Sequence, residues 1–400
     1  MIVYGRDYCA PRSVAYPLAL MDWFVDRYAR GRYKRRNFGP PDAVRPKILF
    51  MTSGHLGDAL ILSYIFPVVR QRYPDAVIDV LSGDWCDPIW QSNPYIRRVL
   101  HLNHPNTNRR NWSNLKKWQS FRQTFRSAVA ALKTETYDYS VDIRFANSPL
   151  HFVLPFIRVR RAIGFGARGW GGLLDDEFFL PNGEFHHFTL LDELWKPLGI
   201  SASIETIQPY FETPGLTAGQ IWQKLGQPQP AGPVVLLCPE AGGTEKMLPT
   251  EFWLDVARRV LPDDTATLVL SGQTNFTATI YETLRRNHAV DASRIVSAVG
   301  KLTIQEMAVL AGASQYAVTL DSLPVHLCSI FCPTVAFFYN GMGLQFFPIS
   351  ARPTLVLHNH TASRELTIHR PDFQSEYVTT FDATTLDRAF EWIQKLVLKQ

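Results

Sequence analysis

No stretch of the 400 residues approaches the roughly 20 consecutive apolar residues that a membrane-spanning helix needs. The opening residues, MIVYGRDYCAPRS, also lack a basic region followed by an apolar core, so we expect no secretory signal. Apolar residues make up 46% of the chain and charged residues 19%, as in soluble globular proteins. We therefore expect a cytoplasmic protein that makes at most peripheral contact with a membrane.

Cysteine is scarce, and no Cys-x-x-Cys spacing occurs. The five cysteines form an odd set: Cys9, Cys86, Cys238, Cys328 and Cys332. This pattern argues against a disulfide scaffold and against the common zinc sites. We expect buried, reduced thiols, as in a cytosolic protein.

Acidic residues are missing from two basic stretches. Residues 27–36 (RYARGRYKRR) carry six positive charges. They either contact an anionic membrane surface on its cytoplasmic side or form a solvated segment. Residues 101–126 interleave Trp and Phe with cations, among them Arg109, Arg110, Lys116 and Lys117. Basic and aromatic residues together suit a phosphorylated glycolipid or nucleic acid, although an exposed helix with buried rings would look the same. We assign the four named cations to an anionic glycolipid or glycan acceptor. The net charge of +5 is modest for this length and favours an acidic ligand over nucleic acid.

The length predicts two domains, and each half alternates short apolar strands with helical patterns. We expect an extension over 1–45, an N-terminal Rossmann-like α/β domain over 46–205, and a second over 234–380. A linker with five prolines, 206–233, separates them, and a helix over 381–400 ends the chain. Strands are predicted at 47–51, 77–81, 139–143, 161–165, 234–238, 267–271, 316–320 and 334–338.

The stretch from Pro46 to Pro74 predicts a buried strand, a turn between Gly54 and Gly57, and one helix that continues to Pro74. Asp58 then lies at the carboxyl edge of a parallel sheet, where ligands bind in open α/β folds. Asp58 could equally be a helix cap, because Asp is favoured there.

Three segments, in this order, resemble the motifs of glycosyltransferase family 9, the heptosyltransferases of lipopolysaccharide core assembly. They are GDALILSYIFPVVRQRYPDAVIDVL (57–81), VVLLCPEAGGTEKMLPTEFW (234–253) and the run from GKLTIQEM to TLDSLPVH and FFYNG (300–341). The resemblance spans residues 46–345 and leaves the extension outside. It implies the GT-B fold, in which two Rossmann-like domains face each other across a cleft.

The resemblance also implies roles for individual residues. Asp58 matches the family's general base, and Lys246 matches the lysine on the donor diphosphate. The donor-binding turn corresponds to Gly243 and Thr244, and the phosphate-and-sugar loop to Asp321, Ser322 and His326. No Asp-x-Asp metal pair is evident; Asp175–Asp176 and Asp263–Asp264 resemble surface turns. A lysine and helix-start N–H groups can stabilise a diphosphate leaving group without a metal. We therefore expect neither metal nor cofactor.

Five positions depart from the family pattern. Leu323 and Pro324 stand where the family has Gly and a backbone donor; Leu248 replaces a Trp; and Gln273 and Asn275 occupy the turn that often carries a ribose-binding Glu. The resemblance implies an inverting, metal-independent sugar transfer from a nucleotide sugar such as ADP-heptose, with heptose as the transferred sugar. The implied acceptor is the lipopolysaccharide core or another cell-envelope glycan, at the cytoplasmic side of the inner membrane. A non-catalytic nucleotide-sugar binder is one alternative. A nucleotide-sugar epimerase is another, although it would need further catalytic carboxylates.

Overall fold

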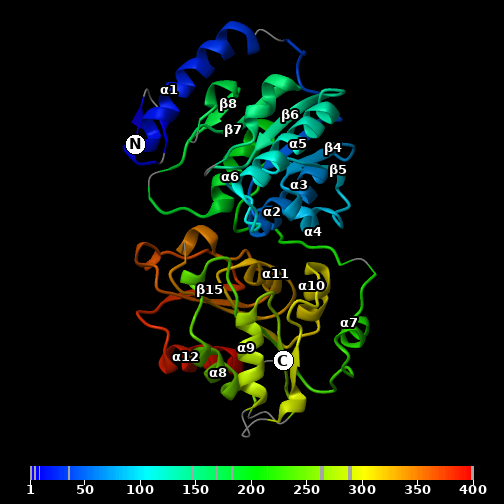
Figure 1. Ribbon diagram of the computed structural model, residues 1–400, viewed down its shortest axis with the longest axis vertical. Helices are drawn as coiled ribbons and strands as arrows, with labels where there is room; N and C mark the ends of the chain where they lie inside the picture. Colours follow the sequence, from blue (N-terminus) through cyan, green and yellow to red (C-terminus); the bar gives the residue numbers. More distant parts are fainter. Residues whose placement is uncertain are drawn as a thin grey trace. The chain divides into compact units, whose positions relative to one another are not determined.

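The computed structural model describes residues 2–3, 6–8, 10–34, 37–145, 148–167, 169–181, 183–213, 215–261, 265–286, 291–341 and 343–397. The chain divides into two compact units, Met1–Ile207 and Gln208–Gln400. Each is built on one parallel sheet covered by helices (Figure 1). The predicted pair of parallel α/β sheets is confirmed. Among the described helices, none is both long enough and apolar enough to cross a bilayer.

The sheet of the first unit has six parallel strands in the order β5-β4-β3-β6-β7-β8. Ile48 of β3 lies between Ile78 of β4 and Tyr139 of β6, so β3 is the central strand. All four predicted strands of this half are present, and β5 and β8 add to them. The strands are β3 (Lys47–Thr52), β4 (Val77–Ser82), β5 (Ile96–His101), β6 (Thr136–Asp142), β7 (Arg158–Phe165) and β8 (Asp176–Phe178).

The single helix predicted after Gly57 is wrong in two respects. The helix begins at Leu56, two residues before Asp58, and ends at Ser63; a second helix then runs over Ile65–Arg72. Pro67 explains the break, because it has no N–H for the Ser63 carbonyl and its ring would clash with that group. The helices of this unit after the extension are α2 (Leu56–Ser63), α3 (Ile65–Arg72), α4 (Asp87–Trp90), α5 (Asn114–Leu132) and α6 (His187–Trp195).

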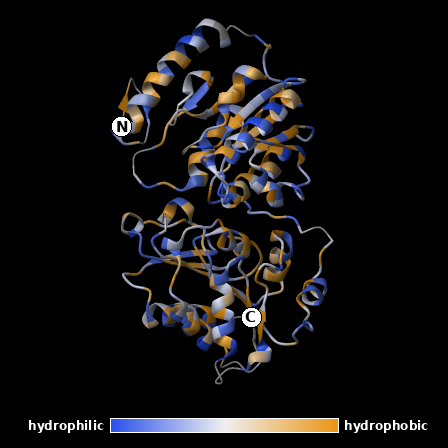
Figure 2. Ribbon diagram, viewed as in Figure 1, coloured by the Kyte–Doolittle hydropathy of each residue, from blue (hydrophilic) through white to orange (hydrophobic). Residues whose placement is uncertain are grey.

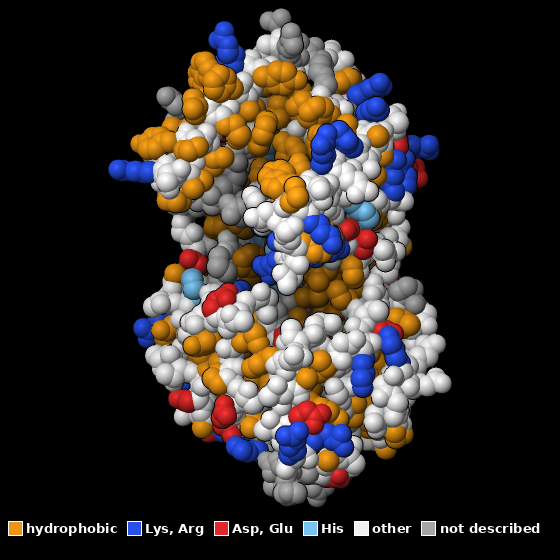
Figure 3. Space-filling view, viewed as in Figure 1, with side chains coloured by type: hydrophobic (Ala, Val, Ile, Leu, Met, Phe, Trp, Pro, Cys, Tyr) orange, Lys and Arg blue, Asp and Glu red, His pale blue; other side chains and the backbone are white. Residues whose placement is uncertain are grey.

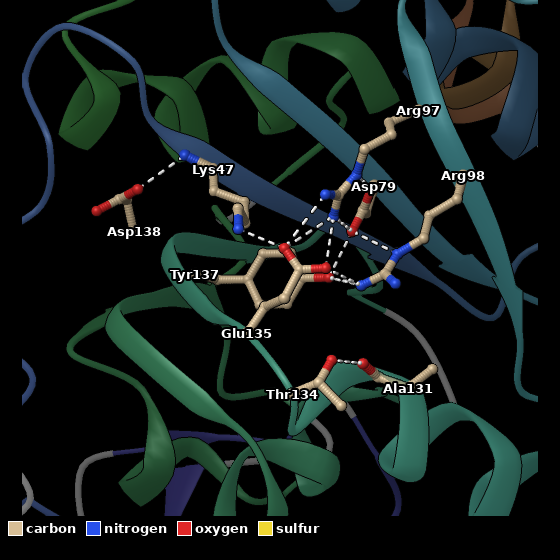
Figure 4. Close-up of polar contacts among 9 residues, drawn as sticks. All are labelled: Lys47, Asp79, Arg97, Arg98, Ala131, Thr134, Glu135, Tyr137 and Asp138. Carbon is tan, nitrogen blue, oxygen red and sulfur yellow. Dashed lines mark hydrogen bonds and ion pairs between the residues drawn. The ribbon is translucent and has the colours of Figure 1, made fainter.

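A network of charges ties the strands together at their amino-terminal ends (Figure 4). Asp79 is fully buried and pairs with Arg97 at 2.6 Å and with Arg98 at 2.9 Å. Glu135 pairs with the same two arginines and with Lys47, the first residue of β3. Because buried charges are tolerated only when paired, this network is structural. It lies at the amino end of β3, whereas the Gly54–Asp58 turn follows the carboxyl end.

The extension packs onto the first unit. Strands β1 (Ile2–Val3) and β2 (Arg6–Asp7) form a short antiparallel ladder, and helix α1 (Arg12–Tyr28) continues into a π-helical turn at Ala29–Tyr33. Arg6 joins α1 to β8 through Asp26 (2.8 Å) and Glu177 (2.6 Å). Part of the basic segment, Arg35 and Arg36, lies outside the described residues.

The second unit has seven parallel strands in the order β11-β10-β9-β12-β13-β14-β15. All four predicted strands are present: β9 (Val234–Cys238), β10 (Thr267–Leu270), β12 (Tyr316–Leu320) and β13 (Thr334–Phe338); β11 (Ile295–Ser297), β14 (Thr354–His358) and β15 (Phe373–Tyr377) add to them. The helices are α7 (Ala218–Leu225), α8 (Thr250–Val260), α9 (Asn275–Arg285), α10 (Ile304–Gly312), α11 (Leu323–Phe331) and α12 (Ala383–Val397). Helix α7 lies inside the proline-rich segment 206–233.

Candidate active site

Both sheets reverse their winding at a central pair of strands. In the first unit the chain passes from β3 outward to β4 and β5, then returns to the other side of β3 as β6. In the second it passes from β9 to β10 and β11, then returns beside β9 as β12. Ligands of open α/β sheets bind outside the carboxyl ends of the strands at such switch points. Asp58 follows β3, Lys246 follows β9 and Asp321 follows β12, so all three lie in loops or helix starts beyond these strands.

Asp58 is the third residue of α2 and has polar partners on three sides. Its Oδ2 accepts a hydrogen bond from the backbone N–H of His55 at 2.8 Å, which satisfies a donor at the helix start. The same oxygen lies 3.5 Å from Arg144 Nη1, and Oδ1 lies 3.8 Å from His187 Nδ1. A Cβ at Gly54 would stand 2.6 Å from the Asp58 side chain, so only glycine lets the turn pass this closely.

The surroundings keep Asp58 ionised. Burial alone would raise its pKa, but the charge of Arg144, followed by His187 and the His55 N–H, more than offsets burial and leaves the pKa below its ordinary value. Burial, Arg109 and Arg144 lower the pKa of the neighbouring His55 to about 4, so this imidazole is neutral at neutral pH. The site therefore contains a carboxylate that can accept a proton.

Arg144 was not predicted from the sequence, and the fold brings it to Asp58. Arg144 follows β6, the neighbour of β3 across the switch point. Asp142 fixes the start of its loop by accepting the N–H groups of Arg144 (3.0 Å) and Leu150 (2.6 Å). His187 is also unpredicted; it opens α6 and is almost fully buried. A basic residue two positions after the end of a strand was the available signal for Arg144.

The four predicted acceptor-binding cations do not form one uniform group. Arg110 pairs with Asp84 at 3.0 Å, so an acid that is remote in sequence supplies the counter-charge that the 101–126 stretch lacks. The guanidinium of Arg110 and the ammonium of Lys116 both lie over the Trp112 ring, at 4.9 Å and 4.4 Å from its centroid. Arg109 is exposed, and its charge acts on His55. Lys117 follows Lys116 on α5, whose Phe121 and Phe125 pack against the core.

In the second unit, Lys246 and Asp321 are joined across the switch point. Lys246 Nζ lies 2.6 Å from Asp321 Oδ2, and the carboxylate side chain is only 6% exposed. A Cβ at Gly341 would come within 2.6 Å of that carboxylate, so the loop after β13 approaches it closely as well. Asp321 thereby holds the Lys246 ammonium at the carboxyl edge of the sheet.

The loop after β9 carries the remaining predicted donor-binding groups. Gly243 precedes a short 3-10 turn over Thr244–Lys246, and its carbonyl accepts the Lys246 N–H at 3.2 Å. Asn340 Nδ2 donates to the Glu245 carbonyl at 3.3 Å, which links this turn to the loop after β13. Gly243, Thr244, Lys246 and Asp321 are thus brought together at one sheet edge.

Glu240, which sequence analysis did not single out, fills the start of α9. Its carboxylate accepts the N–H groups of Gln273 (2.8 Å) and Thr274 (2.9 Å) and the hydroxyls of Thr274 (2.8 Å) and Thr277 (2.6 Å). Burial opposes ionisation, but these donors outweigh it and lower the pKa of Glu240. The turn that lacks its own Glu therefore receives a carboxylate from the neighbouring strand's loop. This carboxylate occupies the positive end of α9, so a phosphate cannot bind to the same N–H groups.

Helix α11 begins in a different way. Ser322 precedes it, but its hydroxyl donates to the Glu240 carbonyl at 3.0 Å and does not cap the helix. Leu323 and Pro324 are the first two helical residues, and Leu323 is not among the residues with positive φ. Pro suits the first turn, where its missing N–H has no intrahelical partner. Leu323 and Pro324 therefore fit the start of α11 without backbone strain. His326 lies one turn further on and is buried.

Two parallel-sheet α/β units of this kind are the domains of the GT-B fold. Residues 213–372 match the model of glycosyltransferase family 9 (heptosyltransferase). This match lies in the second unit; it confirms the resemblance inferred from the motifs and supports a heptosyltransferase-like glycosyltransferase.

Several solved structures share this fold. The glycosyltransferase family 9 protein of Veillonella parvula is 14% identical with a TM-score of 0.63, covering 80% of this chain and 89% of that one. The ADP-heptose lipopolysaccharide heptosyltransferase II of E. coli is 18% identical with a TM-score of 0.63, covering 88% and 99%. The E. coli heptosyltransferase WaaC with ADP is 14% identical with a TM-score of 0.60, covering 87% and 99%. At such identities these matches establish the fold. No curated protein sequence matches significantly.

Proposed function

We propose that this protein transfers a heptose from ADP-heptose to an anionic lipopolysaccharide-core or cell-envelope glycan, on the cytoplasmic side of a bacterial envelope. The observation that carries the proposal is the placement of the predicted groups. An ionised carboxylate whose side chain is only 10% exposed lies at the switch point of the first unit, and a lysine joined to an acid lies at that of the second.

The chemistry of transfer assigns each group one task. The Asp58 carboxylate takes the proton from an acceptor hydroxyl while that oxygen forms a bond to the anomeric carbon. The bond from the anomeric carbon to the diphosphate oxygen breaks, and the leaving diphosphate keeps the electron pair. A single displacement of this kind inverts the configuration at the anomeric carbon. Arg144 keeps Asp58 charged before the reaction and is a positioning residue.

The leaving group needs stabilisation in the second unit. Lys246 supplies an ammonium group held by Asp321, and the start of α11, which has no side-chain cap, supplies the positive end of a helix. The two together can stabilise the developing negative charge without a metal ion. The Glu240 carboxylate is already bonded to the start of α9, so its negative charge would repel a phosphate there. Lys246 and the start of α11 remain as the groups that bind phosphate.

Incubation with labelled ADP-heptose and a truncated, phosphorylated core oligosaccharide tests this proposal. We expect transfer with inversion, detected by NMR of the anomeric proton, and no loss of rate in excess EDTA. Loss of activity in EDTA that Mg²⁺ restores would overturn metal independence. Binding of ADP-heptose without any transfer or hydrolysis, across a panel of glycan acceptors, would support a non-catalytic binder.

A further inference from the structure

Helix α1 has two faces of opposite character. Its inward face is made of small or paired residues, and Ala15, Ala19, Asp22 and Val25 are buried. At 100° per residue the opposite face carries large apolar side chains, which are between 42% and 63% exposed: Tyr16, Leu20, Trp23, Phe24 and Tyr28. Apolar and hydrophilic residues alternate along the ribbon of α1 in Figure 2. A contiguous exposed apolar stripe of this kind marks an interaction surface.

Both acids of α1 face the first unit. Asp22 accepts the Tyr8 hydroxyl at 2.9 Å and the Trp170 N–H at 2.6 Å. Asp26 accepts Arg6 Nη1 at 2.8 Å. These bonds fix the rotation of the helix, because turning the aromatic stripe inward would expose both acids and break their pairs. The outward face of α1 therefore carries no carboxylate.

Cations lie at the two ends of the apolar stripe instead. Arg12, Arg27 and Arg30 are exposed, and Arg27 lines a shallow hollow together with Phe24, Tyr28 and Gly31. Figure 3 shows apolar side chains gathered over the part of the first unit where Figure 1 places α1, with basic side chains at the margin. A surface with an apolar centre and only positive charge at its border matches a lipid bilayer with anionic headgroups.

We propose that α1 lies flat in the surface of an anionic phospholipid bilayer. Leu20, Trp23 and Phe24 insert among the acyl chains, and the Tyr16 and Tyr28 hydroxyls remain at the headgroups, where amphipathic rings are favoured. Arg27 and Arg30 contact lipid phosphates. The helix has 17 residues and two acids that face the protein, so it anchors the first unit on the surface and does not span the membrane. This inference does not depend on the proposed transfer reaction.

Co-sedimentation of the full chain with vesicles, without substrate, tests the proposal. We expect binding to vesicles of phosphatidylethanolamine and phosphatidylglycerol and weaker binding to pure phosphatidylcholine. The triple variant Leu20→Ser/Trp23→Ser/Phe24→Ser should lower the partition coefficient at least about tenfold, because it removes the inserted area. Arg27→Glu/Arg30→Glu should weaken binding to the anionic vesicles only. The matched control is Val44→Ser/Leu366→Ser, which changes exposed apolar residues outside α1 and should bind as the unaltered chain does.

Three results would overturn the proposal. The first is an unaltered chain that stays in the supernatant with anionic vesicles. The second is a triple variant that still co-sediments fully. The third is an unaltered chain that does not bind vesicles but is a dimer by light scattering, while the triple variant is a monomer. The stripe would then bind a second copy of the chain. Because the altered residues are exposed, the thermal midpoint should be unchanged, which separates lost binding from misfolding.

Discussion

Arg144 Nη1 lies 3.5 Å from Asp58 Oδ2, and the two residues follow neighbouring strands, β6 and β3. The pair places a fixed positive charge beside a largely buried carboxylate. Because burial favours the protonated acid and Arg144 favours the ionised one, Arg144 keeps Asp58 available as a base. The role of Asp58 as the base and the role of Arg144 in keeping it ionised can therefore be tested in separate variants.

Arg144→Gln should move the acidic limb of the pH–rate profile to higher pH. Without the guanidinium, burial remains and raises the pKa of Asp58, so the carboxylate is lost at a higher pH than in the unaltered enzyme. The measurement is kcat/KM for transfer as a function of pH. Arg122→Gln, at an exposed position of α5, is the matched control and should leave the limb in place. An unshifted limb in Arg144→Gln would show that Arg144 does not act on the catalytic proton.

Asp58→Asn should lower transfer by about 10²- to 10⁴-fold, the usual effect of removing a general base. The asparagine oxygen can still accept the His55 N–H, so folding and ADP binding should hardly change. Single-turnover transfer and thermal shift with ADP measure the two properties. A normal transfer rate in this variant would leave Asp58 with only its helix-start role.

The parallel sheets could be predicted because their strands are short runs of buried apolar residues such as Val234–Cys238, whose neighbours are turns. Asp58, Lys246 and Asp321 could be proposed because each follows such a strand and lies in a motif. Arg144 and Glu240 could not be found in this way. Their partners come from neighbouring strands of the sheet, and only strand order and side-chain reach bring them together.

The orientation of α1 shows a second limit. Periodicity predicts an apolar helical segment in residues 16–28, and an apolar stripe is normally expected to face the core. Here the small side chains of Ala15 and Ala19 face inward, because Asp22 and Asp26 find their partners on the first unit. Those partners, Tyr8 and Arg6, precede the helix in the chain, and nothing in the sequence pattern indicates the pairing.

The acceptor cations should divide into two groups. Changing Arg109, Lys116 and Lys117 to Ser should raise the acceptor KM and lower its sensitivity to salt, because an anionic acceptor would lose three screened attractions. Arg110→Ser should mainly lower thermal stability, since it leaves Asp84 without its 3.0 Å partner. The measurements are acceptor KM across a salt series and thermal unfolding. Identical kinetics for the triple Ser variant and the unaltered enzyme would remove these cations from the acceptor site.

Glu135 should contribute to stability only above acidic pH. Its hydrogen bond with Lys47, helped by Arg97 and opposed by burial, lowers the pKa of Glu135 from 4.5 to about 2. A lowered folded pKa contributes stability above the unfolded pKa, and this contribution is lost as the pH falls between about 5 and about 2. Urea unfolding should therefore show a steeper loss on acidification for the unaltered chain than for Glu135→Gln. Glu193→Gln, from an exposed pair with Lys196, is the control and should keep the steep loss.

Lys246 should bind the phosphates of the donor and not its nucleoside. Lys246→Ala should weaken ADP by about tenfold or more, as expected for a lost charge-assisted hydrogen bond, and leave adenosine almost unaffected. The variant also leaves the buried Asp321 carboxylate without its 2.6 Å partner, which by itself disturbs the loop. Calorimetric titration of Lys246→Ala, Asp321→Asn and the double variant separates the two effects, because the double variant has no orphaned carboxylate. If Lys246 binds phosphate, the double variant recovers stability but not ADP affinity. The control, Lys395→Ala on α12, should bind ADP as the unaltered chain does. Recovery of ADP affinity in the double variant would mean that Lys246 acts only by neutralising Asp321.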